Sequence, residues 1–133
     1  MNIMEIQNVQ FAYDGKKKVL KGINAQMELG KMYAILGPSG CGKTTLLSLL
    51  GGLDSPTSGQ ILYQGEDIAK TGLANHRRSH VAFIFQSYNL IDYLTPMENV
   101  ALTSKLPPLP ILEQLGLTAE EAKRNVLKLS GGQ

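Results

Sequence analysis

GPSGCGKTT, residues 37–45, is the stretch that decides the fold of this chain. An apolar run at 32–36 precedes it and a leucine-rich run at 46–50 follows, which predicts a strand, a glycine-rich loop and a helix in that order. The glycines let the backbone curl so that successive N–H groups point at one anion, and the helix adds the positive end of its dipole. In this setting the pattern G-x-x-x-x-G-K-[ST] predicts a phosphate cradle, and hence binding of a nucleoside triphosphate.

Two side chains of the loop are expected to complete the cradle. Lys43 would bring a full positive charge to the β- and γ-phosphates, and the Thr44 hydroxyl would ligate Mg²⁺. The alternative is a glycine-rich turn with a solvated lysine, which the flanking strand and helix disfavour. The expected nucleotide-binding residues of the loop are Gly37, Ser39, Gly40, Cys41, Gly42, Lys43, Thr44 and Thr45.

The bulk composition is that of an ordinary globular protein. The chain has 133 residues, room for one domain, with 43% hydrophobic and 18% charged residues and a net charge of +2. That balance argues against nucleic-acid binding, and no apolar run approaches the length of a membrane span. The single cysteine, Cys41, cannot form an internal disulfide, which agrees with a reducing cytoplasm.

The remaining pattern predicts an α/β chain with a β-rich first half and a helical second half. Thr95 and Thr118 each stand three residues before a glutamate and so predict capping boxes at helix starts, and prolines interrupt the chain at 105–110. Strands are expected at 3–11, 19–29, 32–36, 60–65 and 81–85, with a turn at Asp14-Gly15, and helices at 44–50, about 111–115, and from 118 to about 128.

The chain closes on LSGGQ, residues 129–133, after the phosphate loop and Gln86. These motifs in this order resemble the nucleotide-binding domain of ATP-binding cassette (ABC) transporters, in which LSGGQ is the signature. Residues 58–61, 65–68 and 83–90 reinforce the resemblance, and residues 83–90 most resemble the subgroup for macrolide export, lipoprotein release and antimicrobial-peptide resistance. The resemblance implies a P-loop NTPase fold of ABC type: a β-rich subdomain plus the start of a helical subdomain, with the C-terminal half absent.

The resemblance also implies how the chain is divided. Residues 1–133 would be a partial domain, with a β-rich ATP-binding core at 1–86 and the Q-loop and helical subdomain at 87–133. The sequence ends before the Asp-Glu strand and switch histidine of the family, so we expect a truncated chain without catalytic residues and with a loose C-terminus. The candidate substitutes are expected in turns or loops (Asp54, Asp67, Asp92) or on the surface (His76, His80).

By resemblance, further site residues lie outside the loop. Tyr13 would stack on adenine, although it could be a strand tyrosine beside a turn. Gln86, an accessory residue, would reach Mg²⁺ together with Thr44, although it could be a polar cap on a strand. The in-trans contact with ATP on the opposite subunit would come from Ser130, Gly131, Gly132 and Gln133.

The implied cofactors are ATP and Mg²⁺, and the implied partners are membrane-spanning transporter subunits and a second copy of the chain, arranged head to tail. The protein would lie in the cytoplasm on the inner face of the cell membrane and couple ATP binding or hydrolysis to export or extraction. Alternatives are a nucleotide-binding module that does not hydrolyse ATP and, more weakly, an ABC ATPase acting on ribosomes. An apolar cluster after Gln86 could be core or a groove for a membrane subunit: Tyr88, Leu90, Ile91, Tyr93 and Leu94.

Alkylation of Cys41 is expected to block nucleotide binding, because Cys41 lies inside the predicted phosphate loop. The measurement is nucleotide affinity before and after complete modification of the thiol. Unchanged affinity of the fully alkylated chain would contradict the placement of Cys41 in the cradle.

Overall fold

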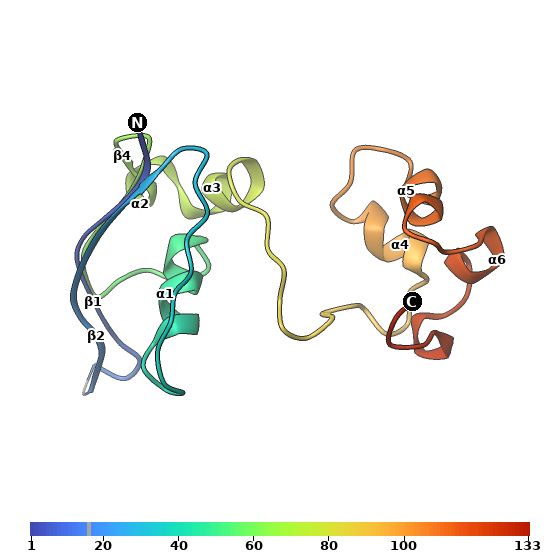
Figure 1. Ribbon diagram of the computed structural model, residues 1–133, viewed down its shortest axis with the longest axis horizontal. Helices are drawn as coiled ribbons and strands as arrows, with labels where there is room; N and C mark the ends of the chain where they lie inside the picture. The colour runs from blue at the N-terminus through green and yellow to red at the C-terminus, as the bar shows by residue number, and fades with distance from the viewer. Residues whose placement is uncertain (16) are drawn as a thin grey trace. The chain divides into compact units, whose positions relative to one another are not determined.

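The computed structural model describes residues 1–15 and 17–133, which form two compact units, Met1–Phe83 and Ile84–Gln133 (Figure 1). The first unit contains β1 (Asn2–Ala12), β2 (Lys18–Glu28), α1 (Lys43–Leu50), β3 (Ser58–Tyr63), β4 (Glu66–Asp67), α2 (Ile68–Thr71) and α3 (Leu73–Ser79). The second unit contains α4 (Pro96–Ala101), α5 (Pro108–Gln114), α6 (Ala119–Ala122) and the 3₁₀ turn η1 (Val126–Lys128).

The first unit is built on an antiparallel sheet in the order β2-β1-β3-β4. The central strand, β1, pairs Ile6 with Ala25 of β2 and with Ile61 of β3. Its apolar side chains meet those of β2, β3 and helices α1 and α2 in one buried cluster: Ile6, Val9, Phe11, Leu20, Leu49, Ile61 and Ile68. The strands predicted at 3–11, 19–29 and 60–65 are therefore confirmed, with ends shifted by a few residues.

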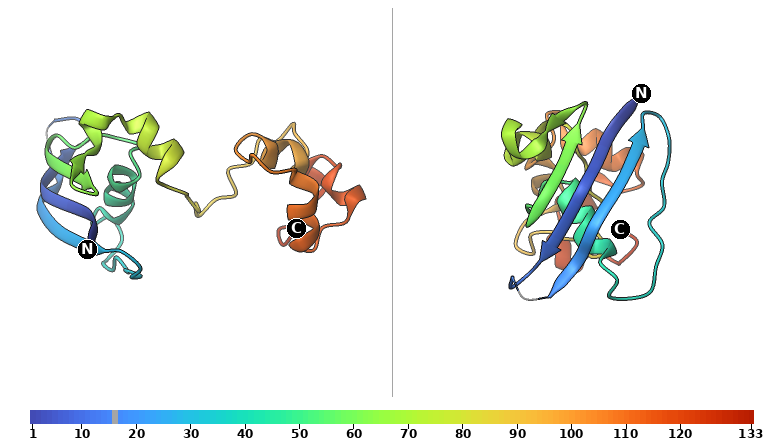
Figure 2. Two further views of the ribbon diagram at one scale, coloured as in Figure 1. Left: turned by 90° about the horizontal axis from the view of Figure 1, so that it is seen from above. Right: turned by 90° about the vertical axis from the view of Figure 1, so that its left-hand side faces the viewer.

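Helix α1 lies against one face of this sheet (Figure 2). The helix begins at Lys43, as predicted from the loop, and ends at Leu50, where Gly51 and the positive φ of Gly52 turn the chain away. Leu49 is fully buried in the sheet cluster, with Leu46 and Leu50 packed around it. Burial of one such leucine stabilises the folded state by about 1.5–3 kcal/mol, so the contact fixes the helix to the sheet.

The strands predicted at 32–36 and 81–85 are wrong, because neither segment is paired with another strand in the described residues. Met32 and Leu36 are 98% and 88% exposed, and Ile84 is fully exposed. An apolar run becomes a strand only where a neighbouring strand accepts its backbone hydrogen bonds. Apolar composition indicated a buried strand at both segments, but a strand also requires a neighbouring strand to pair with.

His76 contradicts the expectation that both histidines lie on the surface. Its side chain is 1% exposed, and Nε2 lies 2.9 Å from the Leu50 carbonyl oxygen at the end of α1. Nδ1 lies 3.2 Å from Nδ1 of His80, whose ring stacks on Tyr63. His80 is exposed, as predicted. Polar sequence neighbours hid the role of His76, which is to satisfy a buried carbonyl.

The second unit is a small cluster of short helices. Leu112, Leu117 and Ala122 form its buried centre, with Met97, Val100 and Leu109 packed around them. Both capping boxes are confirmed at Thr95 and Thr118. The last helix, α6, ends at Ala122 rather than near residue 128. Residues Val126–Lys128 form the 3₁₀ turn η1 instead. The proline run also differs from its prediction, because Pro108 begins α5 in the first turn, where no backbone donor is required.

In the part of the chain that the structure describes, residues 1–15 and 17–133, no helix combines the length and the apolar composition needed to cross a bilayer.

Gly59→Ala is expected to destabilise the first unit by about 3 kcal/mol or more, whereas Gly65→Ala should cost about 1 kcal/mol. Both glycines have a positive φ, +85° and +82°, so both substitutions strain the backbone. A Cβ on Gly59 would overlap the Asn8 carbonyl of β1, while Gly65 faces open space. Urea unfolding of the two variants measures the difference, and equal losses would contradict this close approach of β1 and β3.

Candidate nucleotide-binding site

A pocket of about 420 Å³ lies where the loop before α1 meets the end of β1. Its lining consists of Tyr13, Val19, Ser39, Gly40, Gly42, Lys43, Thr44 and Thr45. The structure therefore brings Tyr13 together with most of the loop residues singled out in the sequence. Gly37 and Cys41 belong to the same loop but do not line the pocket.

The glycines give the loop its path. Gly40 and Gly42 have φ of +78° and +98°, a region that other residues rarely adopt. A Cβ on Gly42 would lie 2.9 Å from the Leu20 side chain and 3.1 Å from that of Val19. The loop is thus pressed directly onto β2, and α1 starts one residue later.

Cys41 packs inside this loop while remaining exposed to solvent. A Cβ added to Gly37 would lie 2.6 Å from its Sγ, so the thiol fills the space that a side chain at residue 37 would need. A bulky group on this sulfur would therefore force the loop to rearrange.

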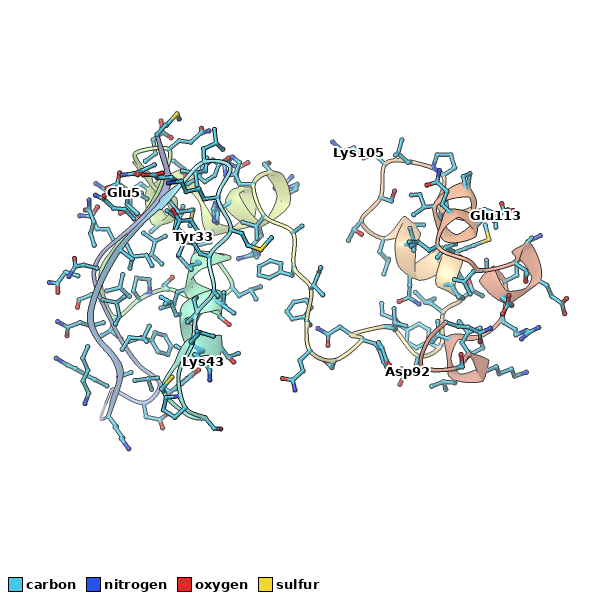
Figure 3. The ribbon with its side chains drawn as sticks, viewed as in Figure 1. Glu5, Tyr33, Lys43, Asp92, Lys105 and Glu113 are labelled. Atoms are coloured by element: carbon cyan, nitrogen blue, oxygen red, sulfur yellow. The ribbon has the colours of Figure 1, made fainter. Side chains whose placement is uncertain are left out.

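Lys43 stands at the start of α1 (Figure 3). Its ammonium group donates to the Gly37 carbonyl and, over 3.4 Å, to that of Pro38. The first N–H groups of a helix have no partner within the helix, so this end of α1 combines unpaired donors, a positive dipole end and a lysine. Such an arrangement can attract an anion, and phosphate oxygens could replace the two carbonyls as acceptors for the ammonium.

Tyr13 is held at the edge of the pocket by two contacts. Its hydroxyl lies 2.6 Å from Oγ1 of Thr45, and its ring meets Phe11 edge to face with a centroid distance of 4.8 Å. The ring is nevertheless 65% exposed. A flat, exposed aromatic face beside a phosphate cradle offers a surface on which a purine base can stack.

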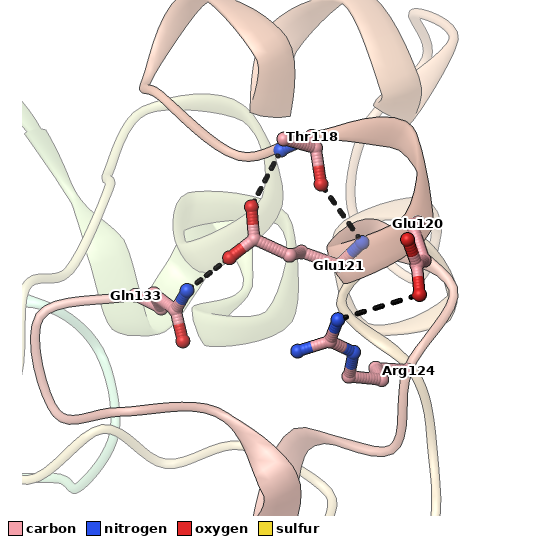
Figure 4. Close-up of polar contacts among 5 residues, drawn as sticks. All are labelled: Thr118, Glu120, Glu121, Arg124 and Gln133. Atoms are coloured by element: carbon pink, nitrogen blue, oxygen red, sulfur yellow. Dashed lines mark hydrogen bonds and ion pairs between the residues drawn. The ribbon is translucent and has the colours of Figure 1, made fainter.

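The C-terminal tail, residues 129–133, is more ordered than expected. Ser130 N–H donates to Oε1 of Gln133 over 2.9 Å, and Gln133 N–H donates to Oγ of Ser130 over 3.3 Å. Nε2 of Gln133 also donates to Oε2 of Glu121 (Figure 4). Side chains thus accept from two backbone donors of the tail, those of Ser130 and Gln133, which the expectation of a loose terminus did not include.

The neighbour of this tail is Tyr88, which follows Gln86 in the chain. A Cβ added to Gly131 would lie 3.2 Å from the Tyr88 hydroxyl, so the glycine allows a close approach. The tail itself stays exposed from Ser130 to Gln133.

Comparison with known proteins decides the family. The family model described as ABC transporter matches residues 20–133. The chain belongs to the ABC transporter family. It is 40% identical to the uncharacterized ABC transporter ATP-binding protein YclH of Bacillus subtilis (strain 168), over all of this chain and 64% of that protein. It is 41% identical to the spermidine/putrescine import ATP-binding protein PotA of Spiroplasma citri, over 99% of this chain and 39% of that protein.

Solved structures agree with the family. The dimeric structure of MJ0796, a bacterial ABC transporter cassette, superposes with a TM-score of 0.81 at 32% identity, over 98% of this chain and 64% of that one. A bacterial Atm1-family ABC exporter with ATP bound gives a TM-score of 0.79 at 29% identity, over 97% of this chain and 25% of that one. The α/β P-loop NTPase fold of ABC type is thus confirmed, and the chain spans less than two thirds of these ABC proteins.

Several residues expected from the ABC resemblance lie in the second unit, apart from the loop in sequence. Gln86 is exposed there, so its joint role with Thr44 at one metal ion stays a prediction. Tyr88, Leu90 and Tyr93 are 76%, 47% and 81% exposed, which excludes a core role for these three. Ile91 and Leu94 are half-buried beside them.

In the second unit, sequence reasoning missed one contact of Glu121. Its place in a capping box was predicted, but its contact with Gln133 was not. The available signal was the spacing S-x-x-Q at 130–133, which repeats the capping-box spacing T-x-x-E at 118–121.

The carboxyl of Glu121 is expected to titrate below its ordinary pKa of 4.5, because hydrogen bonds from the backbone and then the side chain of Thr118 stabilise the charged form, with Arg124 and Gln133 adding to them. A lowered folded pKa means that this stabilisation is complete above pH 4.5 and is lost as the pH falls through the folded value. Carboxyl ¹³C shifts of Glu121 measure it. Thr118→Val should raise the pKa partway, and a parent titration at 4.5 would contradict the network.

Proposed function

We propose that this chain binds ATP with Mg²⁺ and forms part of the ATP-binding subunit of an ABC transporter. The observation that carries the proposal is the pocket in which Tyr13 faces the glycine-rich loop at the start of α1. Membership of the ABC transporter family supports it, as does a second structure of the MJ0796 cassette, a dimer in a post-hydrolysis state bound to ADP and Pi.

The proposed roles follow from the chemistry of the lining. Tyr13 stacks on the base, backbone N–H groups from Gly40 to Thr45 surround the phosphates, and Lys43 neutralises their charge. Thr44 contributes a hydroxyl oxygen, a ligand type suited to Mg²⁺, and Gln86 adds an amide oxygen. The metal, once bound with the nucleotide, neutralises phosphate charge.

The proposed assembly is a head-to-tail pair. Ser130, Gly131, Gly132 and Gln133 of one copy would contact the ATP held by the loop of the other. The exposure of the tail supports this, and MJ0796 provides the example of an ABC cassette solved as a dimer. Partner subunits that span the membrane would dock on the exposed Tyr88, Leu90 and Tyr93, holding the subunit at the inner face of the membrane.

The direction of transport is proposed from the sequence alone. Residues 83–90 support the export and extraction subgroup, whereas PotA of Spiroplasma citri is named for spermidine and putrescine import. Uptake of a polyamine into cells by the transporter that contains this chain would contradict the export proposal.

A second candidate function is nucleotide binding without turnover. Three of the five acidic and histidine side chains considered as substitutes have other contacts: Asp54 accepts from Ser55, Asp67 caps α2, and His76 contacts Leu50. Phosphoryl transfer requires a positioned water in addition to a phosphate clamp. We therefore assign hydrolysis to no residue of this chain, and phosphate release from Mg-ATP by the purified chain separates the two candidates.

Lys43→Ala is expected to weaken Mg-ATP binding at least tenfold, or by about 1.4 kcal/mol, because the charge facing the phosphates is lost. Lys70→Ala is the matched control, since it removes the same charge from α2, outside the pocket lining. Calorimetric titration of both variants and the parent measures the change. Coincident curves for Lys43→Ala and the parent would refute the assignment of the loop.

A further inference from the structure

We infer that Glu121 is a positioning residue for the signature tail, acting through Gln133 to set the conformation of Ser130. The conformation of the tail is inferred from its hydrogen bonds alone, whereas the contact of Ser130 with ATP rests on the proposed function.

The inference starts from two reciprocal pairs of hydrogen bonds joined by a third contact. In the first pair, Thr118 N–H donates to Oε1 of Glu121 over 3.0 Å, and Glu121 N–H donates to Oγ1 of Thr118 over 3.2 Å. Ser130 and Gln133 form the second pair in the same pattern. The donation from Gln133 Nε2 to Glu121 Oε2 links the two pairs (Figure 4).

The chemistry of Glu121 at one end and of the Ser130 N–H at the other fixes which group of the Gln133 amide donates and which accepts. A carboxylate only accepts, so Glu121 requires the amino group of Gln133 to face it. Ser130 N–H only donates, so it requires the oxygen of the same amide. One orientation of the Gln133 side chain meets both demands, and it places the amide between α6 and the tail.

The consequence concerns the hydroxyl of Ser130. Its oxygen accepts from Gln133 N–H, which leaves its own proton available to donate. Ser130 is exposed, so this proton can reach an acceptor such as a phosphate oxygen without prior rearrangement of the tail. Ordering the donor in advance reduces the conformational entropy lost on binding.

The charged neighbours of Glu121 support this arrangement. Arg124, two residues after α6, pairs with Glu120 over 3.6 Å, and its positive charge also favours the ionised carboxyl of Glu121, the acceptor for Gln133. The simpler alternative is that Glu121 serves only to cap α6 and that the tail follows passively.

Three variants separate these readings. Glu121→Gln keeps an oxygen for Thr118 but turns an amino group toward Gln133, which creates a donor–donor contact. Gln133→Glu keeps an oxygen for Ser130 but sets two carboxylates against each other. The double variant Glu121→Gln with Gln133→Glu reverses the polarity of the link and restores every bond. Glu98→Gln in the Thr95 box is the matched control, because its bonds stay within that box.

The measurement is amide hydrogen exchange of Ser130 and Gln133 by NMR on the 133-residue chain without nucleotide, corrected for intrinsic rates. Each single variant should speed exchange about threefold or more, the double variant should return it to the parent rate, and Glu98→Gln should leave it unchanged. The Ala122 amide, which donates to Thr118, reports on α6 itself and should stay protected in all variants.

Parent-like exchange in Glu121→Gln would overturn the inference, and so would failure of the double variant to restore protection. Loss of protection at Ala122 together with the tail would also overturn it, since Glu121 would then act only through α6. Mg-ATP-dependent self-association is followed in parallel. If the exchange results hold but the parent neither binds ATP nor associates, the proposed function fails and the positioning of the tail stands.

Discussion

The close approach of the loop to β2 at Gly42 is the constraint on which the first unit depends. There is no room there for a side chain against Leu20 and Val19, and the positive φ of Gly42 turns the chain directly into α1. This fixes where the helix begins, and therefore which of its residues, Leu49, enters the sheet cluster. The same turn places Lys43 and Thr44 at the pocket, so core packing and the phosphate cradle share one cause.

The other end of α1 depends on polar contacts that arise from α3. Backbone N–H groups of residues 51–53 satisfy the carbonyls of residues 47–49, whereas the last carbonyl of the helix, that of Leu50, meets the His76 side chain. Arg77 donates to the carbonyl of Gly52, just beyond the helix. An unpaired buried carbonyl costs about 1–3 kcal/mol, which explains why a histidine is buried at this end of the helix, beside Tyr63 and His80. A helix anchored at both ends presents a rigid start to any ligand of the loop.

Signals that act within a few residues predicted the structure well. The loop was found from a contiguous motif and both capping boxes are set by groups three residues apart, so their spacing in the sequence was enough to locate them. The runs at 32–36 and 81–85 failed because a strand depends on a partner, which apolar composition does not specify. His76 and the link from Glu121 to Gln133 escaped for the same reason, since each depends on a contact formed only after folding.

The two units therefore keep their order by different means. The first buries a contiguous apolar cluster drawn from β1, β2, β3, α1 and α2, whereas the second has a centre of Leu112, Leu117 and Ala122. A small core stabilises little, so short helices must rely on their caps. The tail, residues 129–133, has no buried core of its own and is held by exposed hydrogen bonds, one of them to Glu121 of the Thr118 capping box. Its conformation is thus set by the donor and acceptor pattern of a few side chains, which a single oxygen-to-nitrogen exchange can reverse.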